Sequence, residues 1–165
     1  MKRVILDTNI YGRMVEKREE ERIRELIGKR PDIIIYGFDV VRKELRAASQ
    51  QMRIDGKRLR LILLGIYDHL TERHMFDTTK LTKKLAEDYY AIYSRIGGIV
   101  SKNEIINDFL IVACASIHEL DIVVSEDKET MLSTEALTAY DIVNRLKQYR
   151  LPAFINYETF GRLLT

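Results

Sequence analysis

The chain has 165 residues, with 27 Lys and Arg against 25 Asp and Glu, and 46% of its residues are hydrophobic. This length fits one domain with an ordinary core, and the hydrophobic content excludes a wholly disordered chain. The net charge of +2 gives only weak overall attraction for nucleic acid, so such a partner would need local basic patches.

Four short apolar runs predict the strands, and helical periodicity lies between them. The runs cover 4–6, 33–36, 122–124 and 153–155, and none alternates with polar residues. Continuous runs of this kind are typical of strands covered on both faces, as in a parallel sheet. The helical patterns cover 16–27, 38–48, 57–70, 81–96, 102–119 and 134–149. This order predicts a single three-layer α/β/α domain over 1–165, whose extra helices between the second and third strands form an appendage or a lid.

The cysteine count and the apolar segments set expectations about the compartment. Cys114 is the only cysteine, so no internal disulfide forms, and Cys/His metal spacings are absent. The first apolar run stops at Asp7, far short of a secretory signal, and the stretch 59–67 is too short to span a bilayer. We therefore expect a soluble, cytoplasmic protein with no membrane partner.

Acidic residues follow two of the predicted strands. Asp7 follows the first strand, and Glu126 and Asp127 come shortly after the third. Open parallel sheets bind their ligands outside the carboxyl ends of the strands. An acid after a strand also commonly caps the next helix, and capping is the better explanation for either position alone.

Two further acids lie within predicted helices. Asp39 is the expected N-cap of a helix over 40–48, on which Glu44 shares its face with apolar residues. A capping box formed by Ser101 and Glu104 starts the later helix, which places Asp108 well inside it. An unpaired carboxylate on a buried face is costly, and no Lys or Arg of either helix shares that face. Convergence of acids from two strand ends and two helix faces would suit Mg²⁺ or Mn²⁺.

Four segments in chain order carry a resemblance to a known family. They are Val4-Ile-Leu-Asp7-Thr-Asn9, Val41-Arg-Lys-Glu44-Leu, Asn107-Asp108-Phe-Leu-Ile-Val-Ala113-Cys-Ala115 and Ile122-Val-Val-Ser125-Glu-Asp127. In this order and over nearly the whole chain, the sequence resembles the PIN-domain ribonucleases. The resemblance implies a compact α/β/α fold and hydrolysis of RNA phosphodiester bonds by a quartet of acids that binds Mg²⁺ or Mn²⁺.

Carried over position by position, the resemblance assigns Asp7, Glu44, Asp108 and Asp127 as the catalytic and metal-binding acids, with Asn9 and Ser125 as supporting residues. Glu126 is outside the family's pattern and is either solvent-facing or an extra acceptor. Many small prokaryotic members are VapC-like toxins inhibited by an antitoxin, so an antitoxin is an expected partner. The length beyond such toxins lies between residues 49 and 96.

Basic residues near these motifs are candidates for contact with RNA phosphates, although a solvated face or a surface ion pair is a slightly better explanation for each one taken singly. They are Arg13, Arg42, Lys43, Arg46 and Lys128, with a second patch at Arg53, Lys57, Arg58 and Arg60. Beside that patch, the apolar residues of 59–67 are too numerous for one helix face, which predicts a homodimer contact or a groove for an antitoxin. Tyr89, Tyr90 and Tyr93 are expected to pack in the core rather than to stack on bases. His69, His74 and His118 are expected to be surface or partly packed residues rather than catalysts.

Other functions fit the sequence less well. A haloacid-dehalogenase-like phosphatase would need a second acid at position 9, which is Asn9, and a receiver domain would need an acidic pair at the first strand. The remaining rival is a PIN-like module that binds RNA or assembles with partners without catalysis and keeps metal for structure.

Overall fold

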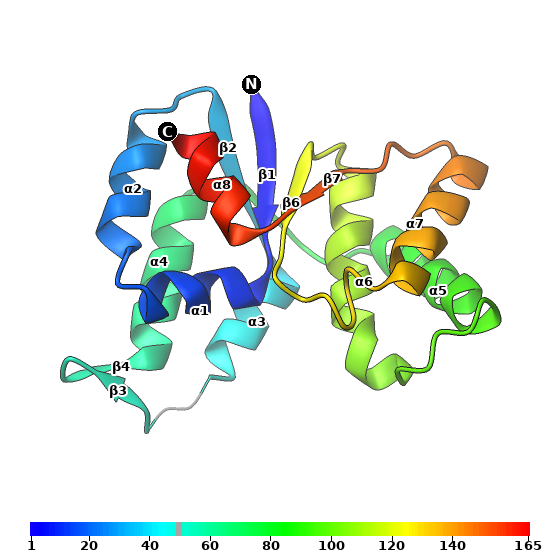
Figure 1. Cartoon of the computed structure of the whole chain (residues 1–165), viewed down its shortest axis with the longest axis horizontal. Coiled ribbons are helices and arrows are strands. Elements are labelled where there is room, and N and C mark those ends of the chain that lie inside the picture. The colour runs from blue at the N-terminus through cyan, green and yellow to red at the C-terminus, as the bar shows by residue number, and fades with distance from the viewer. Residues whose placement is uncertain (49–50) are drawn as a thin grey trace.

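The computed structural model describes residues 1–48 and 51–165, so two residues of the expected segment 49–96 lie outside the described part. Its main sheet has five parallel strands in the order β5-β2-β1-β6-β7 (Figure 1). Their bounds are β1 Lys2–Leu6, β2 Ile33–Phe38, β5 Met75–Phe76, β6 Ile122–Val124 and β7 Ala153–Ile155. Four of these strands confirm the apolar runs, and β5 is a fifth strand that the sequence did not reveal.

Helices cover both faces of this sheet, which confirms the three-layer architecture (Figure 1). In that view α2, α4 and α8 lie on one side of the strands, and α5, α6 and α7 lie on the other. The helices are α1 Thr8–Glu16, α2 Glu20–Gly28, α3 Asp39–Arg46, α4 Leu59–Thr71, α5 Lys80–Arg95, α6 Lys102–Ile117, α7 Thr134–Lys147 and α8 Tyr157–Leu164. Within the described residues, no helix combines the length and the hydropathy that a membrane span requires.

The predicted helix over 16–27 is right only in part, because the chain forms two helices in this region: α1, which was not predicted, and α2, which begins only at Glu20. The first begins directly after β1, where the Asp7 carboxylate accepts a hydrogen bond from the Thr8 N–H at 2.7 Å. It ends at Glu16, and Arg18 between the two helices has a φ of 55°, which a continuous helix does not allow. The C-terminal helix α8 was also missed, since the predicted elements end at 155.

Two predicted helix caps are absent. Phe38 is the N-cap of α3, and Asp39 is instead the first helical residue, where its Oδ1 accepts a hydrogen bond from Thr78 Oγ1 at 2.6 Å. Ser101 is the N-cap of α6, but its side chain makes no capping hydrogen bond, so the expected capping box with Glu104 does not form. Packing between elements, rather than local capping, therefore determines where these helices begin.

The segment between β2 and β6 is an integral part of the domain, so the expected appendage or lid is wrong. A short hairpin, β3 Arg53–Ile54 and β4 Lys57–Arg58, precedes α4, which packs against β2, α1 and α3. Helix α5 packs against α6 and α7. Leu63 and Ile66 are each only 5% exposed, whereas Leu61 is 62% exposed. Leu63 and Ile66 therefore belong to the core and not to a surface contact, while the homodimer itself stays a prediction.

Candidate active site

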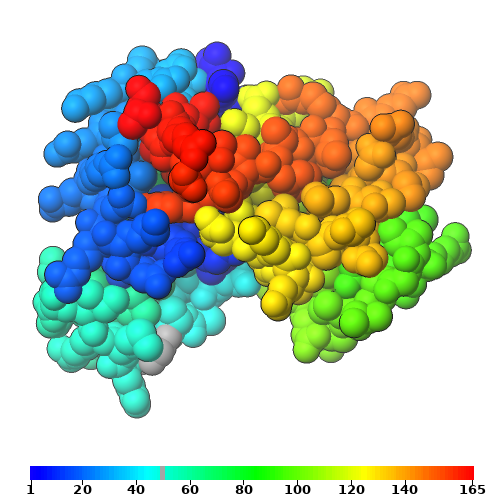
Figure 2. Space-filling model, in the orientation of Figure 1, coloured from blue at the N-terminus to red at the C-terminus, as the bar shows by residue number. Residues whose placement is uncertain are grey.

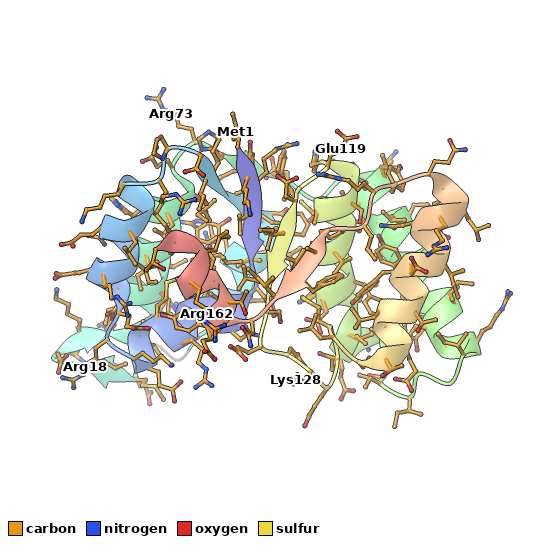
Figure 3. All side chains as sticks on the ribbon, turned by 45° about the horizontal axis from the view of Figure 1, so that its top comes forward. Met1, Arg18, Arg73, Glu119, Lys128 and Arg162 are labelled. Carbon is orange, nitrogen blue, oxygen red and sulfur yellow. The ribbon has the colours of Figure 1, made fainter. Side chains whose placement is uncertain are left out.

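The strand-end acids lie side by side because of the sheet topology. Strands β1 and β6 are parallel neighbours with Leu6 opposite Val124, so the residues that follow them meet at one edge of the sheet. The backbone extends this pairing, because Asp7 N donates to the Val124 carbonyl at 2.9 Å. In Figure 3, Met1 marks the opposite end of β1, and Lys128 lies beyond this carboxyl edge. The chain changes direction across the sheet at β1, which is where open parallel sheets bind ligands.

Asp7 is 4% exposed and is held by donors from two elements. Its Oδ2 accepts hydrogen bonds from Asn9 Nδ2 and from Ser125 Oγ, each at 2.7 Å. Burial is the main cause of a raised pKa for this carboxyl, and the nearby charge of Asp127 adds to it, while the hydrogen bonds oppose the rise. The structure thus places Asn9 and Ser125 in direct contact with Asp7.

Several hydrogen bonds within the loop after β6, and from it to Asn9 and Tyr157, hold this loop in place. Asp127 N donates to Ser125 Oγ at 3.1 Å, and the Asp127 Oδ1 accepts from Thr130 N at 2.9 Å. Glu126 N donates to Asn9 Oδ1 at 3.2 Å, but its side chain turns to accept a bond from Tyr157 N at 2.9 Å, at the start of α8. Glu126 is therefore an acceptor for α8.

Asp108 faces this loop from the middle of α6. The Thr130 hydroxyl lies 2.5 Å from Asp108 Oδ2 and 2.5 Å from Asp127 Oδ2, and so bridges the two carboxyls. The pKa of Asp108 is raised to about 7, chiefly by burial and then by the charges of Asp7, Asp127 and Glu44, while the Thr130 hydrogen bond opposes the rise. Asp108 is thus the acid whose pKa is raised by the charges of all three others.

Glu44 completes the group from α3 and is half-buried rather than part of the core, with Ala47 on the same helix exposed. Thr8 Oγ1 donates to Glu44 Oε1 at 3.0 Å, and the Asn107 side chain also hydrogen-bonds this carboxyl. Burial, followed by the charge of Asp7, raises the pKa of Glu44. The expected inward-facing position is thus correct only in part, because α3 presents Glu44 to the carboxyl edge of the sheet.

The four acids form one electrostatic group at this edge. None of the largest influences on Asp7, Glu44 or Asp108 is a cation. Among the described residues, no three His, Cys, Asp or Glu side chains are arranged to hold one metal ion. The carboxyl oxygens are instead engaged by hydroxyl and amide donors. As a ligand set, carboxylate oxygens without a neutralising cation suit a hard divalent ion such as Mg²⁺ or Mn²⁺.

Sequence reasoning missed three polar residues of this group, Thr8, Asn107 and Thr130. Thr8 and Asn107 stand beside motif acids, so their positions within the motifs were the available signal. Thr130 stands three residues after Asp127, a spacing that allows a turn closed by the carboxylate. Its contact with Asp108 joins residues 22 positions apart, and this pairing has no local signal.

The basic candidates are only partly available for a substrate. Arg13 pairs with Glu16 at 2.8 Å, and Arg42 pairs with Asp68 at 3.1 Å. Lys43 is 73% exposed and lies 3.8 Å from Asp39, whereas Arg46 and Lys128 are exposed at the motif helices and loop. In the second patch, Arg53, Lys57 and Arg58 are exposed on the hairpin, while Arg60 Nε donates to the Ala48 carbonyl at 3.2 Å.

The aromatic and imidazole side chains behave as expected. Tyr89 and Tyr93 are in the core, at 0% and 2% exposure, and Tyr90 is partly buried against it. The His118 ring stacks on Phe76 with centroids 3.7 Å apart, and His69 and His74 are exposed away from the acids. Burial raises the pKa of the Cys114 thiol to about 12, so this side chain is an inert part of the core.

Comparison with known proteins finds similarity in structure only. No family model matches the sequence, and no curated protein matches it. A structure of VapBC2 from Rickettsia felis bound to a promoter DNA fragment contains a similar chain, with a TM-score of 0.62 and 16% identity over 93% of this chain and 98% of that chain. DNA-bound VapBC from Salmonella typhimurium gives a TM-score of 0.60 and 17% identity over 95% and 99%.

A third similar structure is FitAB bound to an IR36 DNA fragment, with a TM-score of 0.58 and 15% identity over 93% of this chain and 94% of that chain. These identities are low, so the likeness establishes the fold. It is the PIN-like α/β/α fold that the sequence resemblance implies, and it confirms that prediction.

Proposed function

We propose that this chain is a metal-dependent endoribonuclease that hydrolyses phosphodiester bonds of single-stranded RNA and acts in the cytoplasm as the toxin of a toxin–antitoxin pair. The observation that carries the proposal is the group of four acids at the carboxyl edge of the parallel sheet, in which burial and neighbouring acids raise the pKa of Asp108 to about 7. Such a concentration of carboxyls is unfavourable for the fold alone and is therefore characteristic of a functional site.

Asp7, Glu44, Asp108 and Asp127 would hold Mg²⁺ or Mn²⁺. A bound divalent ion of this kind lowers the pKa of a coordinated water and neutralises charge on the phosphate. Asn9 and Ser125 orient the Asp7 carboxylate through their hydrogen bonds to Oδ2. This set of residues needs no serine or cysteine nucleophile.

The side chains that surround the acids suit an RNA strand. Exposed cations at Lys43, Arg46 and Lys128 would contact backbone phosphates, which bind chiefly through charge. Arg13 and Arg42 would contribute only if their ion pairs opened. The RNA is expected to be single-stranded, because the unstacked bases of a single strand are accessible to protein side chains.

The test is cleavage of end-labelled single-stranded RNA. We expect cleavage with Mg²⁺ or Mn²⁺, none with excess EDTA, and none by an Asp7→Asn variant purified in parallel. Glu126→Gln is the matched control, because its side chain contacts α8 and should leave cleavage intact. Cleavage that persists in EDTA and in the Asp7→Asn variant would reveal a contaminant or a different mechanism.

The alternative is a PIN-like module that binds RNA or assembles with partners without catalysis. It predicts RNA binding without cleavage under every metal condition. The likeness to chains of VapBC and FitAB complexes favours the toxin instead, and an antitoxin protein is the expected partner. Growth arrest on expression, relieved by a protein encoded beside this chain, would support that partner, and light scattering would test the homodimer.

A further inference from the structure

A pocket of about 520 Å³ lies next to the acids. It is formed by α3, α6 and the start of α5. Glu44 and Asn107 line the pocket, and their side chains also hydrogen-bond to each other within the acid group. In Figure 2 the lower outline of the molecule is notched between the cyan residues on one side and the yellow and green residues on the other. Its volume lies within the range of about 300–1,000 Å³ that is typical of small-molecule sites.

The topology makes this pocket a continuation of the acid site. Strands β5 and β2 are neighbours of β1 in the same parallel sheet, so all their carboxyl ends lie at one edge. The acids lie above β1 and β6, whereas the pocket contains Asp39, directly after β2, and Thr78, shortly after β5. An RNA strand bound at the acids therefore reaches the pocket by following the edge of the sheet past Glu44.

The lining suits a nucleotide rather than an apolar ligand. Lys43 and Lys83 are both exposed and line the pocket, where they would contact a phosphate. Val40 and Leu110 provide apolar surface on which the face of a base can lie. The pocket thus combines cations for a backbone with an apolar surface for one base.

Asp39 is the group that can read this base. Thr78 Oγ1 donates to its Oδ1 at 2.6 Å, and Lys43 Nζ lies 3.8 Å from its Oδ2, so the carboxylate is held in place. An ionised carboxylate only accepts hydrogen bonds, and each oxygen has a further lone pair. Adenine, cytosine and guanine present an exocyclic amino group that donates to such an acceptor. Uracil has no amino group, and its one edge donor, N3–H, lies between two carbonyl oxygens that repel a carboxylate.

We propose that this pocket binds a nucleobase next to the cleaved phosphodiester and that Asp39 selects bases with an amino group over uracil. The proposal rests on the proposed nuclease function and specifies its substrate. Asp39 then determines specificity, and Lys43 and Lys83 determine affinity for the strand regardless of base.

The experiment uses four labelled pentanucleotides of uridine whose central base is A, C, G or U, with binding measured by fluorescence anisotropy in EDTA. We expect the amino-bearing bases to bind about tenfold more tightly than uracil, the size of one charge-assisted hydrogen bond. Asp39→Asn should remove this preference. With the wild-type protein, an oligonucleotide with inosine at the centre, which lacks the amino group of guanine, should bind as weakly as the one with uracil.

Two matched controls belong to the same surface. Asp77→Asn removes an exposed acid close to Thr78, and Lys80→Ala removes an exposed cation of α5, and neither residue lines the pocket. Both variants should keep the base preference, whereas Lys83→Ala should weaken all four oligonucleotides equally.

The outcomes separate this proposal from the nuclease proposal. Equal binding of the four bases, or tight binding of inosine, would overturn the pocket proposal even if the protein cleaves RNA. A preference that Asp39→Asn removes, in a protein that never cleaves RNA with Mg²⁺ or Mn²⁺, would support the pocket and overturn the nuclease.

Discussion

Replacing Asp108 with asparagine should stabilise the metal-free protein near neutral pH. Burial and the charges of Asp7, Asp127 and Glu44 raise the pKa of Asp108 from 3.8 to about 7 in the folded state. Between about pH 4 and pH 7 the folded protein thus retains a proton that the unfolded chain has lost, so stability falls as the pH rises through this window. Below about pH 4 the carboxyl is protonated in both states and imposes no penalty.

The size of the effect follows from that difference. Each pKa unit corresponds to about 1.4 kcal/mol, so ionised Asp108 costs the metal-free fold about 4 kcal/mol above pH 7. An asparagine carries no charge, and its carbonyl can still accept the hydrogen bond that Thr130 donates to Asp108. Asp108→Asn should therefore be more stable than wild type by up to about 4 kcal/mol at about pH 8, with little difference near pH 4.

The assay is urea unfolding followed by circular dichroism in EDTA over this pH range. Glu104→Gln, an exposed substitution on the same helix, should change stability by no more than about 0.5 kcal/mol at any pH. Mg²⁺ should raise the Tm of the wild type by binding to the folded state, and should raise that of Asp108→Asn less. If Asp108→Asn were less stable than wild type at about pH 8 without metal, Asp108 would have a structural role and the reasoning would fail.

Four further substitutions test the packing. Leu63→Asp should abolish folding, because Leu63 is 5% exposed and an unpaired carboxylate there would be buried. Leu61→Asp, at a 62% exposed site of the same helix, should fold normally, and light scattering on this variant measures its mass in solution. Gly37→Ala should lower the Tm by several degrees, because a Cβ there would lie 2.4 Å from the buried Tyr67 hydroxyl. Tyr89→Phe should cost about 1–3 kcal/mol in urea unfolding, because it removes a buried hydroxyl that donates to Asn144 Oδ1 at 2.6 Å.

The candidate site shows which relations a sequence can reveal. Asp7 and Asp127 were identifiable because each lies within three residues of the end of a continuous apolar strand, whereas Asn9 and Ser125 were assigned through the family resemblance of the same segments. The parallel order of β1 and β6 then brings these ends together without further information. Glu44 was identified as a member of the site, but its half-buried position depends on how α3 packs over the sheet edge.

By itself the sequence determined the four longer strands, most of the helices and the identity of the acids, because hydrophobic periodicity and strand-end motifs are local patterns. Only the tertiary structure decided the rest. The two-residue strand β5 exists because β2 supplies its hydrogen-bond partner, and the apolar excess of α4 is core because several elements surround that helix. The contacts of Thr130 with Asp108 and of Thr78 with Asp39 join residues 22 and 39 positions apart. Such pairs are fixed by the packing of whole elements, and no short stretch of sequence contains both partners.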